Sequence, residues 1–207
     1  MTATDDYLAA VRAFADQVAR LASDGWDVPA LGDWTLRRLV AHTASMTTSV
    51  LDALAAPADA SVGLDHASGY YALRRRVDPA VLEAALSAAA AGLEADVEAL
   101  GPEPASTVAR WSAEVEEALR GADEAAVVAT PAGRMFLRDF LAVRTFELAV
   151  HALDIAAATG VGGDLPAPVL AAAATLAATT AVEVDDGATV LRALTGRAAL
   201  PEGYSAL

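Results

Sequence analysis

Four ionisable side chains lie on one stripe of a segment that is otherwise apolar or small. Read as a helix at about 100° per residue, residues 141–155 place Arg144, Glu147, His151 and Asp154 within a narrow arc. Glu147 and His151 are four residues apart, so they lie one turn above each other and could bind the same atom. Metal ligands use this spacing, but so do ordinary ion pairs on a solvent-facing strip. Both interpretations remain open from the spacing alone.

The rest of the chain also favours helices. Periodic apolar residues and end signals predict helices over 7–21, from Thr35 past 46, over 79–100, 106–119 and 135–159, then an alanine-rich helix and a short one over 188–194. A loop is expected over 57–68, a short helical turn over 70–77, a β-like stretch over 126–129 and a turn over 131–133. The predicted class is all-α, with four long antiparallel helices at its centre.

Composition excludes several kinds of partner. The 207 residues carry a formal net charge of -14, which disfavours nucleic acid and anionic membrane surfaces. The uncharged stretch 165–182 is mostly alanine and threonine, which insert poorly into lipid, so a packed helix of a soluble protein is expected. Asp5 and Asp6 stand where a signal peptide would be basic, so the expected location is the cytoplasm. There is no cysteine, so any thiol chemistry needs a thiol from outside.

A histidine on another helix extends the stripe to a candidate ligand set. His42 lies on the predicted second helix; with Glu147 and His151 it gives two imidazoles and a carboxylate. Three such ligands suit a catalytic zinc site with one open position, and they equally suit non-haem iron. Taken alone, His42 is also compatible with an ordinary packed or surface histidine.

Two motifs resemble one protein family. The segments 32–42 (GDWTLRRLVAH) and 144–154 (RTFELAVHALD), together with the approach over 130–140, resemble the signatures of the mycothiol-dependent maleylpyruvate isomerase N-terminal family, within the DinB-like superfamily. The resemblance covers roughly residues 5–157. The ending from Leu194 to Pro201 is similar to tails of actinobacterial members.

This resemblance implies a DinB-like four-helix bundle over residues 1–160, with short accessory helices and a C-terminal helical extension over 161–207 packed on the same domain. It also implies a divalent metal held by His42, Glu147 and His151, with Zn²⁺ expected first and Ni, Fe or Mn as alternatives. Asp154 would orient a ligand, and Arg144 would pair with Glu147 or with an anionic substrate. The implied partners are mycothiol or a similar thiol and a small-molecule electrophile; a homodimer is left open.

Other residues give weaker signals. The run Arg74, Arg75 and Arg76 could place a guanidinium at a pocket mouth, although charge runs are usually solvated. The tryptophans are expected to pack between helices rather than to stack on a ligand, and His66 is expected to be exposed in a loop; the tryptophans are Trp26, Trp34 and Trp111.

Three functions from different classes follow. The first is a metal-dependent thiol transferase or cis-trans isomerase in which the metal activates the thiol. The second is a hydrolase that uses metal-bound water, and the third is a noncatalytic metal-binding protein. Residues 161–207 are few for a sizeable second domain, so maleylpyruvate itself is not expected as the substrate.

Overall fold

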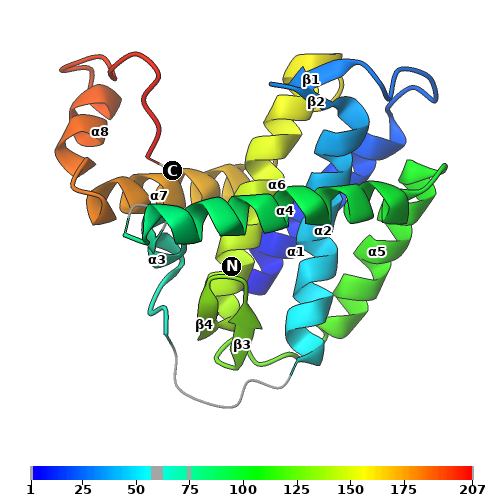
Figure 1. Cartoon of the computed structure of the whole chain (residues 1–207), viewed down its shortest axis with the longest axis horizontal. Coiled ribbons are helices and arrows are strands. Elements are labelled where there is room, and N and C mark those ends of the chain that lie inside the picture. Colours follow the sequence, from blue (N-terminus) through cyan, green and yellow to red (C-terminus); the bar gives the residue numbers. More distant parts are fainter. Residues whose placement is uncertain (1, 57–62, 74–75, 207) are drawn as a thin grey trace.

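The computed structural model describes residues 2–56, 63–73 and 76–206, with backbone alone at 79, 82, 85, 86 and 90. Its elements, in chain order, are α1 (Ala3–Ala19), β1 (Pro29–Leu31), β2 (Trp34–Thr35), α2 (Leu36–Ala55), α3 (Ala67–Ala72), α4 (Pro79–Leu100), α5 (Pro104–Ala118), β3 (Val127–Thr130), β4 (Gly133–Phe136), α6 (Leu137–Thr159), α7 (Ala167–Glu183) and α8 (Gly187–Leu194). The chain is all-α apart from two small hairpins, as the sequence predicts (Figure 1).

Four helices form a closed bundle. Helix α6 packs on α1 and α2, and α5 packs on the same two helices from the other side. Large apolar side chains from all four fill the centre, among them Phe14, Leu39, Val115 and Leu141, each fully buried. The fourth member is therefore α5 rather than the longer α4, which packs mainly on the outside of α2 (Figure 1).

The helix directions correct the expectation of an all-antiparallel bundle. The side-chain amide of Gln17, near the end of α1, donates to the carbonyls of Ala152 and Val161 at the end of α6, so α1 and α6 run the same way. The Arg37 guanidinium at the start of α2 donates to the carbonyl of Gly101, just before α5, so these two helices also run together. The physical reason is α4, which follows α2 and precedes α5 in the chain. Helix α4 crosses the molecule and returns the chain to the end of the bundle where α2 begins, so α5 starts at that end too (Figure 1).

Local sequence signals account for where the helices begin and end. Thr2 and Asp5 form a capping box at α1, and the Thr35 hydroxyl accepts from the backbone of α2. Asp78 caps α4, with proline as the first helical residue. Helix α6 ends at Gly160, which has a φ of 70° and so takes the left-handed conformation that glycine adopts without strain.

The hairpins are the main elements that the sequence did not predict. The sequence predicts no strand over residues 29–35, yet β1 and β2 pair antiparallel there. The β-like stretch over 126–129 corresponds to β3, but its partner β4 takes residues that were assigned to the start of the following helix. Helix α3 begins at Ala67, inside the predicted loop, and the described part of that loop is 63–66.

Residues 161–207 add two helices. Helix α7 packs on α6, α3 and α1, whereas α8 contains no buried residue and contacts α7. None of the helices in the described part of the chain is long and apolar enough to cross a membrane.

Candidate metal centre

The structure brings the predicted ligand atoms together between two antiparallel bundle helices. His42 lies in the second turn of α2, and Glu147 and His151 lie one turn apart on α6. One possible ligand atom from each lies within 4.8 Å of the others. The imidazole rings of His42 and His151 meet edge to face, with centroids 5.0 Å apart.

The polar stripe of α6 faces mainly inward, so the interpretation as a solvent-facing strip is wrong. Arg144 is 6% exposed as a residue, and the side chains of His151 and Glu147 are 14% and 21% exposed. Helix α6 contacts α1, α2, α3 and α7, which leaves little of its surface for solvent. The ionisable side chains are therefore held within the bundle, where each needs a polar or charged partner.

His151 is held from both ring nitrogens. Its Nε2 lies 3.3 Å from Oε2 of Glu147, and its Nδ1 lies 3.0 Å from Oδ2 of Asp154. A carboxylate on one nitrogen fixes the orientation of the ring and makes the other nitrogen a better ligand. Asp154 therefore occupies the place that an orienting group requires.

Glu147 has a second partner, which no sequence pattern indicates. The hydroxyl of Tyr71, on α3, donates to Oε1 of Glu147 at 2.6 Å. Its ring packs edge to face against Phe146, with centroids 5.3 Å apart. Tyr71 thus fixes one carboxylate oxygen and leaves Oε2 directed toward His151. The two residues are 76 positions apart, so no local spacing could reveal the contact.

The surroundings set different protonation states for the two histidines. Burial, the neighbouring His151 and Arg144 lower the pKa of His42 to about 4, against a smaller opposing effect of Glu147, so His42 is neutral at pH 7. Burial also acts to lower the pKa of His151, but the hydrogen bonds and charges of Glu147 and Asp154 outweigh it and raise that pKa above its ordinary value. One imidazole is thus a ready lone-pair donor, whereas the two carboxylates favour the protonated form of the other.

The same contacts keep Glu147 ionised. Burial would raise its pKa, but the hydrogen bonds from His151 and Tyr71 and the charges of His151 and Arg144 together lower it. Burial and the adjacent Glu147 carboxylate raise the pKa of the Tyr71 hydroxyl well above its ordinary value, so Tyr71 remains a donor. The cluster offers a carboxylate that is already charged and already oriented.

These donors fit a divalent ion. Two ligand atoms that each lie about 2.05 Å from a tetrahedral ion are about 3.3 Å apart, and His151 Nε2 and Glu147 Oε2 are separated by 3.3 Å. The ring nitrogens of His42 make no hydrogen bond to any residue that the structure describes, and Trp34 packs against the ring with centroids 5.1 Å apart. Nitrogen and oxygen donors of this kind suit zinc, iron, nickel or manganese, and do not choose among them.

Arg144 does not pair with Glu147, which was one of its two predicted roles. Its Nη1 donates to Sδ of Met46 at 2.9 Å, and its Nη2 donates to the hydroxyl of Tyr70 at 3.2 Å. The guanidinium also lies over the ring of Phe140, 4.5 Å from its centroid. Glu147 is instead occupied by His151 and Tyr71, as described above.

The weaker candidates were the run of arginines at 74–76 and His66. Arg74 and Arg75 fall outside the described residues, and Arg76 is an exposed side chain that binds Glu183 of α7. His66 precedes α3 and its side chain is 56% exposed, as predicted.

The tryptophans also agree with the expectation that they pack. All three are partly buried; Trp26 and Trp111 lie against the guanidinium groups of Arg37 and Arg110, respectively. Trp34 packs beside the ligand set, against His42.

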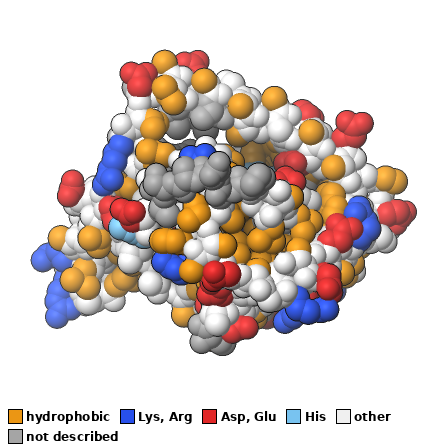
Figure 2. Space-filling model, turned by 90° about the horizontal axis from the view of Figure 1, so that it is seen from below, with side chains coloured by type: hydrophobic (Ala, Val, Ile, Leu, Met, Phe, Trp, Pro, Cys, Tyr) orange, Lys and Arg blue, Asp and Glu red, His pale blue; other side chains and the backbone are white. Residues whose placement is uncertain are grey.

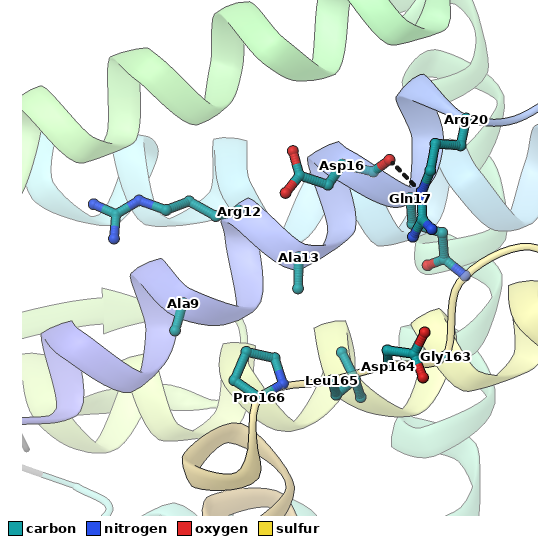
Figure 3. A pocket seen from close by; sticks show the side chains of 10 residues that line it. All are labelled: Ala9, Arg12, Ala13, Asp16, Gln17, Arg20, Gly163, Asp164, Leu165 and Pro166. Carbon is teal, nitrogen blue, oxygen red and sulfur yellow. Dashed lines mark hydrogen bonds between the residues drawn. The ribbon is translucent and has the colours of Figure 1, made fainter.

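The described residues line cavities away from the cluster as well. A cavity of 350 Å³ between α1 and residues 163–166 is lined by Arg12, Asp16, Arg20 and Asp164, as Figure 3 shows, and it contains no histidine. A second, of 860 Å³, lies among α3, α6 and α7 and is largely apolar. Figure 2 shows a hollow on the lower face of the molecule with hydrophobic side chains on its visible wall.

Fold and cluster together define a class of protein: a helical bundle in which the second and the last bundle helices bring two histidines and a glutamate together. The model of the mycothiol maleylpyruvate isomerase N-terminal domain matches residues 7–156, which is most of the chain. The chain belongs to this family, and its all-α fold agrees with the DinB-like architecture. No curated protein and no solved structure matches it.

Proposed function

We propose that the protein binds one divalent metal ion through His42, Glu147 and His151 and uses it to activate a low-molecular-weight thiol for transfer to, or isomerisation of, a small electrophile. The observation that carries the proposal is the half-buried cluster itself, with one donor atom from each residue within 4.8 Å of the others. The family supports the thiol, because it is named for a mycothiol maleylpyruvate isomerase.

The metal would lower the pKa of a thiol placed beside it, so that the thiolate, which is the reactive nucleophile, is present near neutral pH. The chain's own residues prepare the site for that ion. Asp154 holds His151 in one orientation, Tyr71 holds the Glu147 carboxylate, and the low pKa of His42 keeps its imidazole unprotonated. Zinc is the expected ion, because its common catalytic sites have three protein ligands of these types and one open position.

The thiol has to be a cosubstrate. The chain has no cysteine, so it cannot provide a thiolate of its own. The donor set leaves room for an additional ligand, since three protein groups do not complete a tetrahedral shell. An external thiol can therefore take the remaining position next to a bound electrophile.

The test compares thiol conjugation with and without metal. Zinc-loaded protein is incubated with mycothiol and a reactive aryl halide, and the conjugate is measured by mass spectrometry. We expect conjugate formation at least tenfold faster than with thiol alone, and loss of this gain after His151→Ala but not after His66→Ala, which removes an exposed histidine. Equal rates with and without metal would overturn the proposal. Turnover of an ester substrate without thiol would favour the hydrolase alternative instead.

A further inference from the structure

Arg144 is a buried cation whose direct contacts within the described residues are all neutral. The residue is 6% exposed, and its contacts are the Met46 thioether, the Tyr70 hydroxyl and the faces of two aromatic rings. Its Nε is buried and has no hydrogen-bond partner. No carboxylate of a described residue lies within ion-pair distance of the guanidinium. A thioether is a weak acceptor, so one of the strongest donors in the protein is paired with one of the weakest acceptors.

The guanidinium lies next to the candidate metal centre. Arg144 is one turn before Glu147 on α6, and its contact Met46 is one turn after His42 on α2. One helical turn corresponds to about 5 Å along the axis. Tyr70 is the chain neighbour of Tyr71, which binds Glu147. The same two helices and the same short helix α3 therefore hold both the ligand set and the guanidinium.

Such a charge is expensive to keep unless something pairs with it. A buried ion without a counter-ion destabilises a fold, and apolar residues of similar size are often more stable in its place. The neighbouring carboxylates are already engaged, since Glu147 binds His151 and Tyr71 and Asp154 binds His151. With a divalent ion bound, the two carboxylates balance the ion, and the guanidinium charge is left for an anion from outside.

We propose that Arg144 binds the carboxylate of a small organic substrate beside the metal centre. The planar guanidinium presents paired N–H donors that match the two oxygens of a carboxylate. The guanidinium lies over the rings of Phe140 and Tyr70. Because Tyr70 is partly exposed, solvent reaches the neighbourhood of the guanidinium from that side. An incoming carboxylate replaces weak hydrogen bonds to Met46 and Tyr70 with charged ones. These largely apolar surroundings suit a flat organic monoanion better than a strongly hydrated phosphate. That the carboxylate belongs to the electrophile rests on the proposed function, whereas its binding to Arg144 does not.

The experiment measures binding of two probes of equal shape. Crotonate carries a carboxylate, and crotonamide replaces it with a neutral amide. Calorimetric titration of the full chain, both zinc-loaded and treated with a chelator, is expected to show crotonate binding at least tenfold more tightly than crotonamide in both forms. Arg144→Met should abolish this preference. Arg138→Met makes the same exchange at an arginine of α6 whose side chain is 46% exposed, and should keep the preference.

A second measurement separates binding from structural support. Arg144→Met should change the free energy of unfolding little, because removal of a buried charge offsets the loss of its weak Coulomb attraction to Glu147; a purely structural arginine would give a clear loss. Arg144→Lys keeps the charge without the paired donors and should bind crotonate several-fold more weakly, so it serves as the test if the methionine variant fails to fold. Equal crotonate affinity in wild type and the Arg144 variants overturns the proposal. If the wild-type protein binds no zinc but still prefers crotonate to crotonamide, the proposed function is wrong and this inference stands.

Discussion

Replacing Tyr71 by phenylalanine tests whether the ligand set is held in place before any metal binds. The substitution removes only the hydroxyl that donates to Glu147 at 2.6 Å, and the ring keeps its packing against Phe146. Oε1 of Glu147 then lacks its donor inside the bundle. Because that hydrogen bond favours the ionised form of Glu147, we expect its pKa to rise and the folded state to lose stability.

The size of the effect follows from the charge and the burial of the carboxylate. A hydrogen bond to a charged group contributes about 1.5–3 kcal/mol. The Glu147 side chain is 21% exposed, so water can replace part of the lost contact and the lower half of that range, about 1.5–2 kcal/mol, is expected. For a chain of this size, that corresponds to a melting temperature lower by about 3–8 °C.

The assay is urea unfolding of metal-free protein across pH. The pKa of Glu147 is lowered in the folded state, so its contribution is fully present above the unfolded value near 4.5 and is lost as pH falls through the folded pKa. The difference in the free energy of unfolding between wild type and Tyr71→Phe should therefore be constant near pH 7 and become smaller below about pH 4. Tyr7→Phe is the matched control, because it removes a buried hydroxyl that donates to the neutral carbonyl of Met46. It should cost about 1 kcal/mol at any pH. If Tyr71→Phe and Tyr7→Phe lower the free energy of unfolding equally, with the same dependence on pH, the reasoning is refuted.

Three further outcomes are expected. Asp154→Asn should weaken zinc binding about 10–100-fold, measured by competition with a chromogenic chelator, because His151 loses its orienting carboxylate; unchanged affinity would argue against that role. Zinc binding should release close to one proton near pH 6, because the raised pKa of His151 keeps that imidazole protonated there, and progressively fewer protons as the pH rises above that pKa. His42, whose pKa is about 4, should contribute no proton. Calorimetry in buffers of different ionisation enthalpy measures the number of protons released at each pH. Gly162→Ala should cost about 1–3 kcal/mol more than Gly160→Ala: both glycines have positive φ, but a Cβ at Gly162 would lie 2.6 Å from the Gln17 side chain, whereas one at Gly160 would meet nothing within 4 Å. Equal losses for the two glycine variants would contradict this account of Gln17.

The ligand candidates could be found from the sequence because their signal is local. Glu147 and His151 are one turn apart on a single helix, and such spacing is visible without any knowledge of the fold. Helical periodicity also predicted the length of α6, whose end at Gly160 is marked by a residue type. The convergence of His42 on the same point needed the family resemblance, because nothing local relates α2 to α6.

Other parts depended on long-range contacts. Tyr71 and Met46 contact the stripe from 76 and 98 residues away, so no spacing in the chain points to them. The direction in which the stripe faces could not be predicted either, since apolar residues surround it on the helix and either side could have been exposed. Whether α4 or α5 is the fourth bundle helix depends on which of them packs its apolar face against α1 and α2. Helix α5 does so, since its Val108 and Val115 are buried in the core.

Metal content of the purified protein tests the central claim most directly. The chain has 3 histidines, which makes a complete set of matched variants small. After zinc loading and desalting, elemental analysis should find one zinc per chain in wild type and in His66→Ala, and a clear loss in His42→Ala and in His151→Ala. The same zinc content in all four proteins would contradict a metal centre formed by His42, Glu147 and His151.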